Sequence, residues 1–279
     1  MKRRYRFFAV CLILTLLLTG IQACGSKKAE QELPAEQETS APEQDSFEDQ
    51  TEAGDETPET VPLSDTVRWF NASYAVLTDL NNWDYTLFGG MEATESSKSL
   101  VQKLLDEWWG VTDRATADET LQWILEEGHR VEFVEMMQYL EECGIAEEEE
   151  DRRLDFMLEY FDIETEVAEM YVNCYKAYTE RGENCIAGWD HCRALNLMSY
   201  YYVAGYYTEE EALDKSLEIA ETAQPLFTSW DDLIDSYMYG YEYWAEESSD
   251  DRRAVYEDLK SRDDNPYVVD YQITLEKTW

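Results

Sequence analysis

The stretch IAGWDHCRALNLMSYYYVAG, residues 186–205, is the part of the chain around which we expect the rest to fold. It has the length of a helix and is apolar almost all round. Its few polar interruptions include Asp190, His191, Arg193, Asn196 and Ser199. A helix with so little polar surface is normally buried in the middle of a domain. Asp190 and Arg193 are three residues apart, so they share a face of this helix and can pair.

The composition excludes one large class of partners. The 279 residues include 62 acidic and 22 basic side chains, which gives a formal net charge of −40. A chain this acidic repels phosphate backbones, so we expect no nucleic-acid partner. Aromatic residues make up 14% of the chain, which is enough aromatic area to fill a large core.

Residues 1–24 have the pattern of a bacterial export signal. Four basic residues at the start precede the apolar run 7–20, which is too short to span a bilayer comfortably. Ile21-Gln22-Ala23-Cys24 resembles a lipoprotein cleavage box. The resemblance implies a signal peptide at 1–23, cleavage before Cys24, and a diacylglyceryl group on its sulfur. We therefore expect a lipid anchor at Cys24 on the extracytoplasmic face of the cell membrane; the alternative is an ordinary signal peptide with an incidental cysteine.

Residues 24–63 carry that cysteine and then a low-complexity segment rich in Glu, Gln, Thr, Pro, Ala and Asp. Such a segment buries too little apolar surface to offset its ordering entropy, so we predict a disordered acidic tether. Its role would be to hold the folded part of the chain away from the membrane.

Residues 64–279 have the size of one domain, and their apolar periodicity predicts an all-α fold of about ten helices. Predicted helices cover residues 65–80, 97–109, 131–143, 147–161, 164–181, 186–205 and 250–262. A capping box at 116–119 begins a further predicted helix that ends at Gly128, and a second box at 208–211 begins one that ends at Pro225. Ser229 caps another predicted helix. Residues 267–275 would form at most a marginal strand.

Three segments of this domain together resemble a known bacterial family. They are 108–114 with 128–130, then 188–190 with Arg193 and 205–206, and finally 229–230 with Tyr237, Gly240 and Trp244. In order and spacing they resemble the domain-of-unknown-function family numbered 1266. The resemblance implies an α-helical domain built on these Trp, Asp and Arg positions, with no agreed substrate or catalytic set.

The same segments supply the candidate catalytic residues, which are Asp190, Arg193, Asp113, Arg114 and His129. If the segments converge on one pocket, Asp190 would act as a base and an arginine would bind an anionic ligand. The alternative is that these residues form internal pairs that fix how helices meet, because ion-pair networks resemble active sites. His129 follows Gly128 at a helix junction, where a histidine can bond freed carbonyls.

Two further groups of residues admit structural interpretations. Cys143, Cys174, Cys185 and Cys192 are disulfide candidates, with Cys174–Cys185 or Cys185–Cys192 as short closures and free buried thiols as the alternative. A zinc site at Cys185, His191 and Cys192 has no established ligand spacing, so we expect no metal and no cofactor. Asp231 and Asp232 follow Trp230 at a predicted helix start, where the helix dipole favours acids.

Three hypotheses for function remain. No phosphate-binding glycine loop, nucleophile elbow or metalloprotease helix is present. The first hypothesis is an anchored domain that binds a protein or ligand in the cell envelope. The second is an enzyme of unknown class that uses the Asp/Arg/His pocket. The third is a self-protection protein that captures a basic toxin through its acidic surface.

Overall fold

The computed structural model describes residues 63–279. The predicted signal peptide, the lipidation site at Cys24 and the acidic tether lie outside the described residues. Their boundaries therefore remain predictions.

The described residues form an all-α fold, as predicted, with no strand among them. The α-helices are α2 (Asp65–Ser73), α3 (Ala75–Leu80), α4 (Glu95–Trp109), α5 (Arg114–Glu126), α6 (Gly128–Glu142), α7 (Arg153–Tyr160), α8 (Thr165–Arg181), α9 (Ala187–Val203), α10 (Glu209–Ala223), α11 (Trp230–Ala245) and α12 (Asp250–Ser261). Short 3₁₀ helices are η1 (Ile145–Glu147), η2 (Glu150–Arg152), η3 (Gly182–Asn184), η4 (Gln224–Leu226) and η5 (Pro266–Val268).

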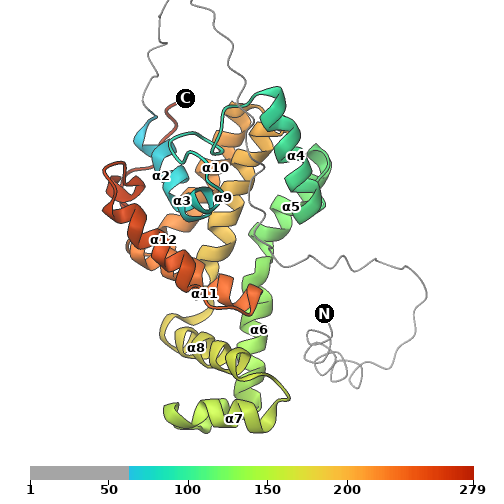
Figure 1. Ribbon diagram of the computed structural model, residues 1–279, viewed down its shortest axis with the longest axis vertical. Helices are drawn as coiled ribbons and strands as arrows, with labels where there is room; N and C mark the ends of the chain where they lie inside the picture. The colour runs from blue at the N-terminus through green and yellow to red at the C-terminus, as the bar shows by residue number, and fades with distance from the viewer. Residues whose placement is uncertain (1–62) are drawn as a thin grey trace, which may run out of the picture. The chain divides into compact units, whose positions relative to one another are not determined.

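The central position predicted for residues 186–205 is confirmed by α9. Every residue of α9 except Arg193 and Tyr202 is buried. It packs most extensively on α10 and α11 and also contacts α2, α4, α5 and α6 (Figure 1). The apolar character of this helix on all sides therefore reflects neighbours on all sides.

Two predicted helix caps, Thr208 and Ser229, are confirmed by the structure. Thr208 accepts a hydrogen bond from the amide of Glu211, whose carboxylate bonds back, so this capping box is present. Ser229 caps α11 by accepting from the amide of Asp232. The capping box predicted at residue 116 is wrong. Asp113 is the N-cap of α5, and Thr116 is the third residue of the helix that completes the box from the other side.

Three helix boundaries also differ from the prediction. Gly128 begins α6, whereas α5 already ends at Glu126. The single helix predicted for 65–80 is divided at Tyr74, whose φ of −119° and ψ of 14° lie outside helical values. The acidic residues before α7 form η1 and η2 rather than the first turn of one long helix.

A second, smaller core lies outside the main one. Helices α7 and α8 pack on each other, and α8 reaches the main body through α11. The buried side chains of this part include Phe133, Met137, Leu140, Met157 and Cys174, none of which belongs to the main apolar cluster around α9. The prediction that all helices pack on α9 therefore holds for only part of the domain. Although α6 contacts α9, it also forms a lobe with α7 and α8, at the lower end of the view in Figure 1.

The C-terminal segment binds the main body without forming the marginal strand that was predicted. The indole N–H of Trp69 donates to the carbonyl of Tyr271 at 3.0 Å, and that of Trp230 donates to Val269 at 2.7 Å. Tryptophan side chains therefore satisfy carbonyls that a strand would have paired. Within residues 63–279, none of the helices combines the length and the apolarity that crossing a membrane requires.

Candidate functional site

The carboxylate of Asp190 lies against the first turn of α6. Its side chain is 1% exposed, and it accepts hydrogen bonds from the amides of His129 at 3.0 Å and Arg130 at 3.1 Å. The residue before the helix, Glu127, makes no side-chain cap. Asp190 therefore satisfies the freed amides of α6 from another helix, and its charge interacts favourably with the positive end of the helix dipole.

Gly128 makes this approach possible. Its φ is +60°, a conformation that L side chains rarely adopt, and a Cβ at this position would lie 2.2 Å from Oδ2 of Asp190. Any other residue would push the carboxylate away from the amides. Gly128 is thus needed at the start of α6, because its lack of a Cβ lets Asp190 reach and cap that helix.

Arg130 joins three helices at this point. One of its guanidinium nitrogens lies 3.1 Å from Oδ2 of Asp190 and donates to the carbonyl of Ile124 at 2.8 Å. The other donates to the carbonyl of Leu125. Arg130 therefore satisfies carbonyls at the end of α5 and neutralises the buried charge of Asp190 on α9. Together, Arg130 of α6 and Asp190 of α9 stabilise the junction between α5 and α6. We call Gly128, His129, Arg130 and Asp190 the Asp190 junction.

Arg193 lies beside the Asp190 junction and stacks on tryptophan rings. Its guanidinium carbon is 4.3 Å from the ring centroid of Trp109 and 4.4 Å from that of Trp189. One nitrogen lies 3.3 Å from Nδ1 of His129, whose ring also makes an edge contact with Trp123 at 5.2 Å. The same Nδ1 lies 3.5 Å from Oδ1 of Asp190, so it is placed between the guanidinium of Arg193 and the carboxylate.

The protonation states at the Asp190 junction are unfavourable for acid–base catalysis. Burial acts to raise the pKa of Asp190, but hydrogen bonds from His129 and the amide of Arg130 outweigh burial, so its pKa lies below the usual value. Burial also lowers the pKa of His129 below its usual value, and the hydrogen bond to Asp190 only partly offsets this. At neutral pH the ionised carboxylate of Asp190, whose pKa is low, thus lies beside the neutral imidazole of His129. Both carboxylate oxygens of Asp190 already accept hydrogen bonds, which leaves Asp190 a weak candidate for a general base.

Asp113 and Arg114 do not join this group. Asp113 is exposed at the start of α5, where its side chain caps the helix. Arg114 stacks on Tyr207 with its guanidinium carbon 3.3 Å from the ring centroid, and it pairs with Asp118 at 3.2 Å and Glu211 at 3.3 Å. Because Arg130 binds carbonyls near the other end of α5, the two sites are separated by about 15 Å along that helix. The structure therefore does not bring Asp113 and Arg114 together with Asp190, Arg193 and His129.

The comparison with known families agrees with the three segments found in the sequence. A family model described as "Protein of unknown function (DUF1266)" matches residues 104–271, more than half of the chain. The chain belongs to the DUF1266 family. No curated protein and no solved structure matches it. The DUF1266 match contains the whole Asp190 junction, so this arrangement lies within the family domain.

The folded unit is larger than the DUF1266 match. Helices α2 and α3 precede residue 104, yet Trp69 and Phe70 of α2 are fully buried in the main core. They belong to the same hydrophobic cluster as the residues of α9. A fragment that begins at the match would therefore expose core surface.

The four candidate cysteines are free thiols in the structure. Cys174, Cys185 and Cys192 are buried, and burial raises the pKa of Cys185 to about 12. Such thiols are protonated at neutral pH and are poor nucleophiles. No three His, Cys, Asp or Glu side chains within residues 63–279 are placed to hold a metal ion.

His191 is one of the residues that line a groove between α5, α9 and α10. The groove has a volume of about 390 Å³, and its walls include Leu121, Leu125 and Ile219. The His191 side chain is 5% exposed and its Nδ1 makes no hydrogen bond among the described residues. Burial is the main cause that lowers the pKa of His191 to about 4. This histidine is therefore neutral at neutral pH.

We expect His191 to make stability fall as the pH decreases from about 6.5 toward about 4. In that window the unfolded chain binds a proton that the folded chain rejects, so acid favours unfolding. The His191 contribution lost between pH 7 and pH 5 is about 2 kcal/mol. Urea unfolding of the parent and His191→Gln at both pH values measures it. Equal pH dependence in the two proteins would contradict the neutral buried state.

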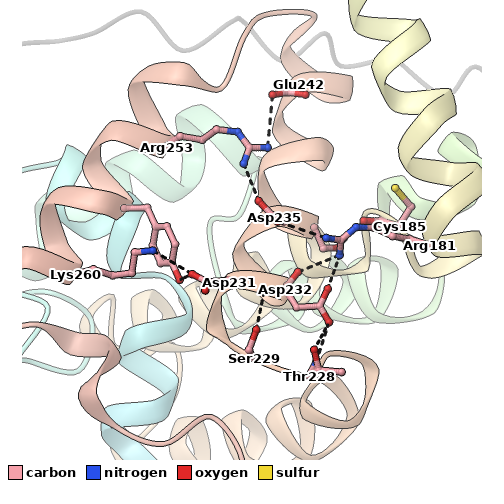
Figure 2. A network of polar contacts seen from close by, with 12 residues as sticks. Arg181, Cys185, Thr228, Ser229, Asp231, Asp232, Asp235, Glu242, Arg253 and Lys260 are labelled. Atoms are coloured by element: carbon pink, nitrogen blue, oxygen red, sulfur yellow. Dashed lines mark hydrogen bonds and ion pairs between the residues drawn. The ribbon is translucent and has the colours of Figure 1, made fainter. Parts of the chain in front are cut away.

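The acidic start of α11 forms a structural network. Figure 2 shows Arg181 of α8 between Asp232 and Asp235, while Arg253 of α12 also reaches Asp235. The guanidinium of Arg253 lies 2.7 Å from the carboxylate of Asp235, and the ammonium group of Lys260 on α12 lies 3.1 Å from the carboxylate of Asp231. The network links α8, α11 and α12, and Asp231 and Asp232 lie in the first turn of α11, as their predicted place at a helix start requires.

Proposed function

We propose that this DUF1266 protein is a lipid-anchored binding protein of the bacterial cell envelope, attached through Cys24, whose helical domain binds a protein partner. The observation that supports binding over catalysis is the use of Asp190. Both of its oxygens are committed to the start of α6 and to Arg130. A general base needs a free oxygen within reach of a substrate proton.

The other candidate residues support the same proposal. Arg193 packs on Trp109 and Trp189, and Arg114 packs on Tyr207 and pairs with acids of its own domain. An arginine binds an anionic substrate through the N–H groups at its guanidinium edge, and here those of Arg114 donate to Asp118 and Glu211 while one of Arg193 faces Nδ1 of His129. These contacts support the binding hypothesis over the enzyme hypothesis.

The anchor is supported by residues 1–24 alone. Their basic start, short apolar run and the box ending in Cys24 together have the pattern of a lipoprotein signal. The anchor is tested by growing producing cells with a fatty acid that carries a chemical label. We expect the parent to incorporate the label and Cys24→Ser to lose it; a labelled Cys24→Ser protein, or an unlabelled parent, would contradict anchoring at this residue.

Binding is tested by placing a photo-crosslinking amino acid, one site at a time, on separate exposed faces of the domain in living cells. Suitable exposed positions are Leu100 on α4, Tyr160 on α7, Leu226 in η4 and Val268 in η5. We expect one face to give a reproducible adduct with an envelope protein. Absence of an adduct from every face would contradict the proposed function.

A further inference from the structure

Four aromatic rings form an incompletely buried cluster on the lobe built by α6, α7 and α8. Phe156 and Tyr160 of α7 stack with ring centroids 5.4 Å apart, and Phe161 lies 5.0 Å from Tyr160. Tyr139 of α6 meets Phe161 at 6.3 Å. None of the four is fully buried, and Tyr160 is 59% exposed. We call these residues the α7 aromatic cluster.

The α7 aromatic cluster lies in the most acidic part of the lobe. Residues 147–169 contain 11 acidic and 2 basic side chains. Both basic residues are engaged locally, because Arg152 pairs with Asp155 at 3.1 Å and Arg153 lies over the ring of Tyr175 at 5.1 Å. Exposed aromatic faces and an excess of carboxylates therefore occur together.

Both features favour cations. Aromatic faces attract a guanidinium or ammonium group through the ring quadrupole, and carboxylates attract its charge. Elsewhere in the domain, Arg193 stacks on Trp109 and Arg114 stacks on Tyr207 in the same way. We propose that the α7 aromatic cluster is the docking surface for an arginine- or lysine-rich segment of the protein partner. The inference rests on the proposed function and assigns the partner's chemistry and the contact surface.

Two other exposed large apolar side chains, Trp123 and Val268, are less suitable as the docking surface. Trp123, at 38% exposure, already packs on His129, and Val268 is on η5, where tyrosines and tryptophans bond the main body. Docking of a second copy of this lobe would bring two strongly acidic segments together, which is repulsive. A basic partner has the complementary charge.

The test measures binding of a dye-labelled oligo-arginine peptide to the full-length protein by fluorescence anisotropy. General attraction to an acidic protein would also give binding, so the decisive variants leave the charge unchanged. We expect Tyr160→Ala to weaken binding about three- to tenfold, because one cation–π contact is lost. Tyr160→Phe keeps an aromatic face and should bind like the parent. Val268→Ala, at an exposed site of 65%, is the matched control and should leave binding unchanged.

Four results would overturn this inference while leaving the proposed function open to the crosslinking experiment. The first is equal binding by the parent and Tyr160→Ala, which would place the peptide elsewhere on the acidic surface. The second is a concentration-dependent dimer that Tyr160→Ala dissociates, which would assign the cluster to self-association. Failure of the peptide to bind the parent would exclude a basic partner. Crosslinks at Leu100, Leu226 or Val268 but none at Tyr160 would overturn only the assignment of the α7 aromatic cluster as the docking surface. The absence of a crosslink at every position would contradict the proposed function itself.

Discussion

Replacing Asp190 by asparagine is expected to lower the free energy of unfolding by about 3–5 kcal/mol. The amide group of asparagine can accept from only one side, so its NH₂ would face the backbone amides or the guanidinium of Arg130. Arg130 would also keep a charge that is 19% exposed and has lost its counter-ion. Urea unfolding at neutral pH measures the loss.

Asp155→Asn is the matched control for this substitution. Asp155 also pairs with an arginine, Arg152 at 3.1 Å, but both side chains are more than half exposed. Exposed ion pairs contribute little, so we expect a change below about 1 kcal/mol. A stability of Asp190→Asn equal to or above that of the parent would mean that the charge is kept at a cost to folding, and would restore Asp190 as a candidate for binding or catalysis.

The second large effect is expected for Gly240→Ala, where α11 crosses α9. A Cβ at residue 240 would lie 2.1 Å from Cβ of Trp189 and 2.6 Å from Cγ. Cβ of Trp189 is bonded directly to the backbone of α9, so relief requires the two helices to separate. We expect a loss of about 1–3 kcal/mol, the usual cost of overpacking, measured by urea unfolding.

Whether Gly240→Ala lowers or raises the stability distinguishes steric overlap with Trp189 from the ordinary helix preference for alanine over glycine. In an open helix, alanine is more stable than glycine by about 1 kcal/mol, so an unchanged or raised stability would show that the helices do not meet at residue 240. Gly144→Ala is the companion variant. No atom lies within 4 Å of its added Cβ, but its φ is +104°, so it reports backbone strain without overlap.

Sequence patterns predicted the parts of the fold that depend on neighbouring residues. The burial of α9 followed from the lack of a polar face between residues 186 and 205. The Thr208 cap followed from its capping box with Glu211, and the Ser229 cap from a serine placed before an apolar helical stripe. The interpretation of residues 116–119 failed because Asp113 competes for the same role, and its side chain accepts from the amide of Thr116. Two acceptable caps three residues apart cannot be ranked by pattern alone.

The Asp190 junction depends on contacts that local patterns do not contain. His129 and Asp190 are 61 residues apart in the chain, and helical periodicity reports only which residues share a face. The sequence contained one indication, Gly128 followed directly by His129 and Arg130 between two helices. We interpreted this glycine as the end of a helix, although its lack of a Cβ is what admits Asp190 to the next one. The identity of its partner required the fold.

The most direct test of the account is a double-mutant cycle between Asp190→Asn and Arg130→Met, measured by urea unfolding. The account holds that this pair fixes the junction of α5, α6 and α9. It predicts that each single substitution destabilises the protein and that the two are coupled by about 1–3 kcal/mol. Additive effects, together with an Asp190→Asn protein as stable as the parent, would contradict it.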